Sequence, residues 1–311
     1  MTTVPAKRPA RGRPAPGDGH ARLPRPRRGS PTSRMLTLFG DYWWGRAEPL
    51  PSAAIVALLA DFGVSEAAAR AALSRMVKHR LLEPSRSGRT TGYRLAPRAV
   101  AVMGDALARI LAFGAEERAW DGTWSIVALD DGPLPRTLRD AVRSRLQWLG
   151  FARLVDGMWL SPWDRHAEAL DELRALGVVD VTTFTARLPA ASPGRARPEE
   201  AWDLAGLAAD YRAFIADATR LRAALAGGRV DPARALVQRT ELTDRWIALA
   251  NSDPDLPVEL LPAGWPRAEA RALLIEAHEA LGERAMERVK EAIRAIEPDR
   301  ADLVMRRSFR G

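Results

Sequence analysis

Polar side chains recur on one side of a segment with helical periodicity between Ser65 and about Arg80. The stripe expected to face the core is mostly apolar and consists of Ala69, Leu73, Met76, Val77 and Arg80. The stripe turned away from it consists of Arg70, Ser74, Arg75 and Lys78. Arginine and lysine donate hydrogen bonds to guanine edges and phosphates, and serine contacts either, so this outward stripe predicts a DNA-recognition helix. An ordinary solvated helix surface is the alternative.

The elements around this segment come in the order of a winged helix-turn-helix. Helical periodicity begins near Ser33, a second helix follows Pro51, and residues 61–64 interrupt it before Ser65 caps the third helix. Residues 81–86 and 90–95 read as two short strands joined by a turn. Four side chains of this hairpin are candidates for contacts with phosphates or the minor groove: Arg86, Arg89, Thr90 and Tyr93.

The net charge of +8 comes from the N-terminus. Residues 1–34 hold nine basic residues and one acidic residue, with many prolines and glycines and few large apolar residues. We therefore expect a disordered basic tail, which either adds non-specific affinity for phosphates or has no function. In the electrically balanced remainder, residues 65–94 carry seven basic residues and two glutamates. The predicted recognition helix and hairpin thus form a local basic patch.

Few residues could carry catalysis or hold a metal. Cysteine is absent, which excludes thiolate nucleophiles and thiolate zinc sites, and the four histidines are far apart without ligand spacing. Asp130 and Asp131 follow a predicted strand, and two such pairs across a dimer could hold a hard cation such as Mg²⁺ for phosphodiester cleavage. The sequence Asp-Asp-Gly-Pro is also an ordinary turn. We expect no catalytic residue, metal or cofactor, and a metal-dependent nuclease is the alternative.

The remaining sequence predicts a ferredoxin-like unit and a helical unit. Predicted elements between Trp120 and Thr185 alternate in the order βαββαβ, and the Asp-Gly pair at 156–157 marks the hairpin. Gly227 ends a later helix and Asp231 caps the next. The predicted protein is α+β with four regions: a tail at 1–34, a winged helix-turn-helix domain at 35–112, a ferredoxin-like domain at 118–190 and a helical domain at 198–311. No apolar run approaches the roughly 18 residues of a membrane span, so a cytoplasmic protein is expected.

Three groups of residues, in the same order along the chain, resemble one known family. They lie at 38–41, 62–64, 69–75 and 87–95, then at 119–124 and 147–151, then at 253–262 and 264–266. These residues look like those of the PaaX family, repressors of phenylacetic acid catabolism, and the resemblance covers residues 33 to 285.

The resemblance implies a dimeric transcriptional repressor that binds double-stranded operator DNA and is released by an aryl-CoA thioester, typically phenylacetyl-CoA. It also makes the middle unit similar to the small ferredoxin-like nuclease of CRISPR adaptation, whose acidic residue ends the first strand as Asp130 does here, which keeps the nuclease alternative open. A ligand-sensing module that binds CoA without operator DNA is a third hypothesis. No residue in the sequence locates the effector pocket.

Overall fold

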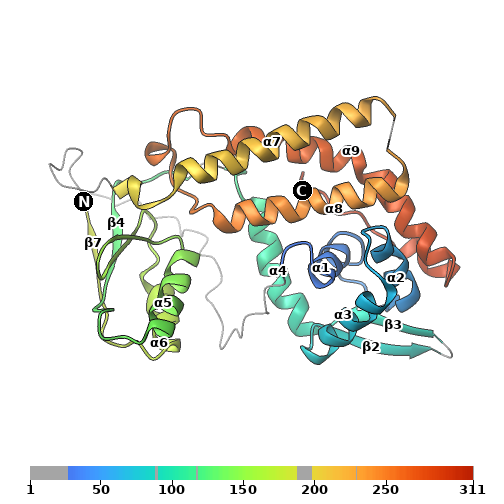
Figure 1. Cartoon of the computed structure of the whole chain (residues 1–311), viewed down its shortest axis with the longest axis horizontal. Helices are drawn as coiled ribbons and strands as arrows, with labels where there is room; N and C mark the ends of the chain where they lie inside the picture. The colour runs from blue at the N-terminus through green and yellow to red at the C-terminus, as the bar shows by residue number, and fades with distance from the viewer. Residues whose placement is uncertain (1–26, 88–89, 117, 188–197, 229, 311) are drawn as a thin grey trace, which may run out of the picture.

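The computed structural model describes residues 27–87, 90–116, 118–187, 198–228 and 230–310. Figure 1 shows three parts: a winged-helix part, a sheet with two helices, and long helices that connect them. The first part comprises α1 (Pro31–Tyr42), β1 (Leu50–Pro51), α2 (Ser52–Ala60), α3 (Glu66–Lys78), β2 (Leu82–Ser87), β3 (Thr90–Leu95) and α4 (Pro97–Ala112). The second comprises β4 (Trp124–Ala128), α5 (Arg136–Trp148), β5 (Ala152–Val155), β6 (Met158–Ser161), α6 (His166–Ala175) and β7 (Thr182–Ala186). The third comprises α7 (Leu204–Ala226), α8 (Pro232–Ser252) and α9 (Arg267–Arg294), with the short 3-10 helices η1 (Pro198–Ala201), η2 (Val258–Leu260) and η3 (Pro298–Leu303).

The first part has the predicted helix-turn-helix and hairpin. Strands β2 and β3 pair antiparallel, and β1 pairs with the other edge of β3, so the sheet order is β1-β3-β2. Strand β1 was not predicted, because two residues are too few to show strand periodicity. Helix α1 begins at Pro31 after the N-cap Ser30, so residues 31–34, predicted as tail, belong to this helix. Residues 1–26 of the predicted tail lie outside the described residues.

Gly92 of β3 lies where the chain entering β1 comes close to the hairpin. A Cβ at this position would be 2.9 Å from the Pro49 Cβ and 3.1 Å from the Leu50 carbonyl oxygen. Because neither neighbour is the end of a flexible side chain, Gly92→Ala is expected to destabilise the protein by about 1–3 kcal/mol in urea denaturation. Gly104→Ala in α4 is the control, since a Cβ there meets only the Trp44 ring at 3.6 Å. Equal losses in the two variants would contradict the steric explanation.

The second part is the predicted ferredoxin-like unit. Its sheet has the order β5-β6-β4-β7, and all neighbouring strands are antiparallel. Helices α5 and α6 cover one face, where Val127, Val142 and Leu173 are buried. Gly157, with φ of +75°, lies in the turn between β5 and β6, as the Asp-Gly pair predicted. The α+β class with a winged helix, a ferredoxin-like unit and a helical C-terminal part is therefore confirmed.

The last strand of this unit is shorter than predicted. The β-branched run suggested a strand from Val178, but β7 begins at Thr182. Val178 is buried against the α5–α6 side of the sheet, whereas Val179 is 80% exposed. The first valines thus belong to the connection that leaves α6, where one apolar contact replaces strand pairing.

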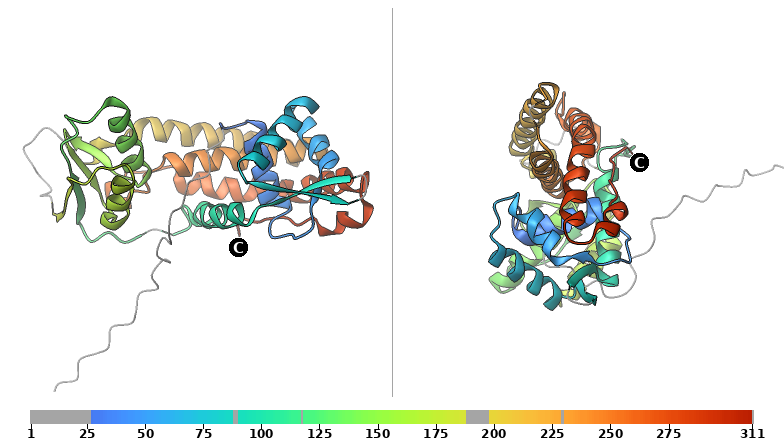
Figure 2. Two further views of the ribbon diagram at one scale, coloured as in Figure 1. Left: turned by 90° about the horizontal axis from the view of Figure 1, so that it is seen from below. Right: turned by 90° about the vertical axis from the view of Figure 1, so that its right-hand side faces the viewer.

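The long helices pack against the winged-helix part at two places along their length. Trp246 of α8 and Leu274 of α9 are buried together with Ile110 of α4. Further along, Leu236 of α8 and Leu281 of α9 belong to the same hydrophobic cluster as the core of α1, α2 and α3. Figure 2 shows these helices running from the ferredoxin-like part to the winged helix. The winged-helix part therefore shares its core with the C-terminal helices, although sequence patterns divide the two into separate units.

Candidate nucleic-acid interface

Helix α3 presents all four predicted side chains to solvent. Its N-cap Ser65 accepts a hydrogen bond from the Ala68 N–H at 3.3 Å, so the helix starts where the sequence predicted. The buried residues of α3 are Ala69, Ala72, Leu73 and Met76, and the exposed ones include Arg70, Ser74, Arg75 and Lys78. The prediction that Arg80 faces the core is wrong. The helix ends at Lys78 and Arg80 has φ of 55°, so helical spacing no longer sets the direction of its exposed side chain.

The cations of this face differ in their partners. Arg70 forms an ion pair with Glu66 one turn earlier, with 2.7 Å between Nη2 and Oε1 and both side chains more than half exposed. Such exposed pairs contribute only about 0.3–0.5 kcal/mol, so Glu66 restrains Arg70 weakly. Within the described ranges, neither Arg75 nor Lys78 has an acidic partner within 4 Å. These two side chains can contact DNA without first breaking an ion pair.

Two small residues complete the exposed face. Ala67 and Ala71 are exposed and lie one turn apart, beside the cations. Small side chains let a helix backbone approach the bases closely, and a methyl group can contact the methyl group of thymine. Sequence reasoning missed these residues, although alanines four apart next to a basic stripe were a usable signal.

The hairpin exposes Arg86 but packs Tyr93 partly against the core. Figure 1 shows β2 and β3 beside α3. Arg86 is exposed and pairs in register with Thr91, whereas Thr90 lies opposite Ser87 and is half-buried. Tyr93 packs partly buried against the winged-helix core, so much of its ring is occupied by packing. Arg89 lies outside the described residues.

The acidic pair at the end of β4 is engaged in local contacts. Asp130 accepts a hydrogen bond from the Gly132 N–H at 3.1 Å, which is the contact of a side-chain-stabilised turn. Asp131 accepts from Arg153 of β5 at 3.1 Å. Nowhere in the described ranges do three or more His, Asp or Glu side chains come together as metal ligands. The contact between Asp130 and the Gly132 N–H is the one that the turn interpretation predicts.

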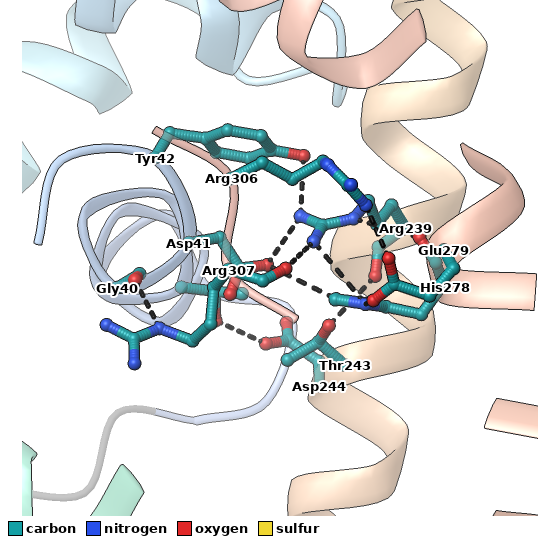
Figure 3. Close-up of polar contacts among 11 residues, drawn as sticks. Gly40, Asp41, Tyr42, Arg239, Thr243, Asp244, His278, Glu279, Arg306 and Arg307 are labelled. Carbon is teal, nitrogen blue, oxygen red and sulfur yellow. Dashed lines mark hydrogen bonds and ion pairs between the residues drawn. The ribbon is translucent and has the colours of Figure 1, made fainter. Parts of the chain in front are cut away.

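A buried arginine attaches α1 to the C-terminal helices. Arg239 of α8 is fully buried, and Figure 3 shows its guanidinium between α1 and α9. Its five N–H donors meet five acceptors: the Asp41 carboxylate at 3.1 Å, the Tyr42 hydroxyl at 2.9 Å, the His278 carbonyl at 3.2 Å and Nδ1 at 3.4 Å, and the Arg307 carbonyl at 2.5 Å. We call these five residues the Arg239 cluster.

The cluster contains one buried ion pair and a neutral histidine. Burial alone would raise the pKa of Asp41, but Arg239 and His278 together outweigh it, so the pKa of this carboxyl lies below its usual value. Burial lowers the pKa of His278. Because the Arg239 guanidinium has no lone pair, His278 Nδ1 must accept the hydrogen bond, and its proton lies on Nε2.

Two further contacts hold the recognition elements on the C-terminal helices. Arg288 of α9 binds both carboxylate oxygens of Asp61, in the turn before α3, at 2.8 and 3.1 Å. Arg300 of η3 donates to the Pro49 carbonyl at 2.5 Å, next to β1. The position of α3 and the hairpin therefore depends on α8, α9 and the segment after them.

The arrangement of α3 and the hairpin, joined to a ferredoxin-like sheet and a helical bundle, defines a winged-helix protein of three parts. Residues 30–99 match the family model of PaaX-like proteins, 117–200 the PaaX central Cas2-like domain, and 202–291 the PaaX-like C-terminal domain. The chain belongs to the PaaX family, as the resemblance of its motifs indicated.

One relative and one solved structure resemble this chain over most of its length. The transcriptional repressor PaaX of Escherichia coli (strain K12) is 34% identical to this chain over 268 residues, and the match covers 84% of each chain. The solved structure of an uncharacterized protein from Mycobacterium tuberculosis has a TM-score of 0.57 at 24% identity, and the match covers 85% of this chain and 99% of that chain. This second likeness shows a shared fold. Within the described part of the chain, no helix has the length and apolar character needed to cross a membrane.

Proposed function

We propose that this protein is a homodimeric DNA-binding transcriptional repressor without enzymatic activity. Helix α3 enters the major groove, the hairpin contacts the neighbouring backbone, and two copies read an inverted repeat. The observation that carries this proposal is the exposed face of α3, where Arg75 and Lys78 are free of acidic partners among the described residues. The 34% identity to a transcriptional repressor supports the same role. A repressor must meet its operator, so this role places the protein in the cytoplasm.

The proposed signal is an aryl-CoA thioester such as phenylacetyl-CoA, and the proposed targets are genes for aromatic acid catabolism. Family membership supports this choice, and no metal or other cofactor takes part. A ligand shifts a conformational equilibrium only through different affinities for the two states, so the thioester must favour a conformation with wrongly spaced recognition helices. The core shared by α3, α8 and α9 supports such a route, since a shift of the long helices moves α3.

The test is fluorescence anisotropy with a duplex selected from random sequence, at about 150 mM salt to screen the basic tail. We expect sequence-specific binding that phenylacetyl-CoA releases. A scrambled duplex controls for non-specific binding, and CoA without the acyl group controls for the thioester. Specific binding that ignores the thioester would discard this effector. Absence of specific binding would overturn the repressor and favour the nuclease or the sensing module.

A further inference from the structure

A hollow of about 360 Å³ lies on the ferredoxin-like part, away from the recognition helix. It is bounded by α5, the loop after β4, and strands β5 and β6. Its lining consists of Asp131, Arg136, Arg139, Asp140, Arg143, Arg153 and Trp159, and we call it the arginine hollow. Its volume lies within the range of small-molecule sites, and the proposed DNA contacts do not use it.

Three of its arginines form one stripe of α5. Val142 and Leu146 turn the apolar side of this helix toward the core, which leaves Arg136, Arg139 and Arg143 at i, i+3 and i+7 on the hollow. Like charges at such spacings repel each other along a helix. Arg136 has only a 4.0 Å contact with Asp140, and the described residues supply no acidic partner within 4 Å to the other two. A bound anion would relieve this repulsion.

Two buried donors in the same hollow have no acceptor within the described ranges. Trp159 is 2% exposed, and its indole Nε1 has no hydrogen-bond partner. The Nε of Arg153 is also buried and unpartnered, although its Nη2 contacts Asp131 and Asp156, each at 3.1 Å. Buried donors are nearly always satisfied in folded proteins. Two such donors among four arginines indicate a ligand rich in acceptor oxygens.

We propose that the arginine hollow binds the phosphate groups of a small phosphorylated molecule. Guanidinium groups donate paired hydrogen bonds that match phosphate oxygens. Asp131 orients Arg153 through hydrogen bonds, and this pairing offsets the negative charge of Asp131. An adjoining hollow of about 770 Å³ shares Asp131, Arg139 and Arg153 and extends past Met158 and Thr182. Because Asp130, Asp156 and Asp180 also line it, it suits the uncharged part of the molecule, while the phosphates lie in the arginine hollow. The identity of the ligand rests on the function proposed above: it is the CoA thioester, and the arginine hollow recognises its diphosphate and 3′-phosphate groups.

The test is isothermal titration calorimetry of the full chain with two probes, inorganic pyrophosphate and coenzyme A. The hollow variant Arg139→Gln/Arg143→Gln is expected to bind each probe about tenfold or more weakly than the unmodified protein, because two charged donors are lost. Trp159→Phe removes one donor with little change in bulk and is expected to weaken binding by about threefold. The control Arg174→Gln/Arg212→Gln removes two exposed charges from α6 and α7, and should bind both probes normally.

Operator binding by the same variants separates the possible failures. The hollow variant should bind selected duplex DNA as tightly as the unmodified protein does. Unchanged affinity of the hollow variant for both probes would overturn the arginine hollow while leaving the repressor intact. A second result would also overturn the proposed phosphate site: the unmodified protein binds neither probe, and the hollow variant loses operator binding. That result would show that these arginines contact DNA. If probe binding depends on the hollow but no specific DNA binding exists, the hollow stands and the repressor fails.

Discussion

Arg239→Ala is expected to lower the free energy of unfolding by about 3–5 kcal/mol. The substitution leaves the Asp41 carboxylate buried at 4% exposure, with His278 neutral and Arg239 no longer supplying a cation. It also leaves the carbonyl oxygens of His278 and Arg307 without their donor. Urea denaturation followed by circular dichroism would measure the loss.

Two controls separate charge from packing in the Arg239 cluster. The double variant Arg239→Met/Asp41→Leu replaces the ion pair with apolar side chains of similar size and should recover most of the lost stability. Arg212→Ala removes an exposed arginine from α7 and should change stability by less than about 0.5 kcal/mol. A loss below about 1 kcal/mol for Arg239→Ala would show that the buried pair does not hold α1 in place.

The pH dependence of stability gives an independent check on this ion pair. Since the pKa of Asp41 is lower in the folded state, its contribution is fully present above the unfolded pKa. That contribution is lost as the pH falls through the lower folded value. Arg239→Ala removes the cation that lowers this pKa, so the loss of stability on acidification should be smaller in the variant. The same acid dependence in both proteins would contradict the assignment.

Arg75→Ala/Lys78→Ala is expected to weaken operator binding roughly 100-fold or more, with the fold intact. A specific base contact is worth roughly 1–3 kcal/mol. Both side chains are exposed on the face of α3 opposite its buried residues. Because neither makes an ion pair with the described residues, their removal should leave thermal stability almost unchanged. Fluorescence anisotropy with the selected duplex measures the affinity.

Arg70→Ala provides a graded comparison on the same helix. The ion pair between Arg70 and Glu66 has to be released or shared when DNA binds. Arg70→Ala should therefore weaken operator binding more than twofold, but less than removal of the Arg75 side chain does. Arg212→Ala on α7 serves as the control for general loss of positive charge. A double variant whose operator affinity stays within about twofold would show that α3 is not the recognition element.

Sequence signals that act within a few residues determined most of the secondary structure. Ser65 caps α3, Gly157 lies in the β5–β6 turn and Asp231 caps α8, each as predicted, because caps and turns depend on neighbouring backbone groups. The outward stripe of α3 was readable for the same reason, since helical spacing alone sets which side chains share a face. Those local patterns, with the motif resemblance, were sufficient for the α+β class and the family.

Only the tertiary structure decided which charged groups meet. Arg239 and Asp41 are almost 200 positions apart, and among 44 arginines no local pattern marks the one that becomes buried. Arg153 and Trp159 likewise join the α5 arginines only when β5 and β6 fold beside that helix. The sequence also did not predict the core that joins α3 to α8 and α9. Burial and pairing depend on which surfaces pack together, and amphipathic periodicity shows that a face is apolar without naming its partner.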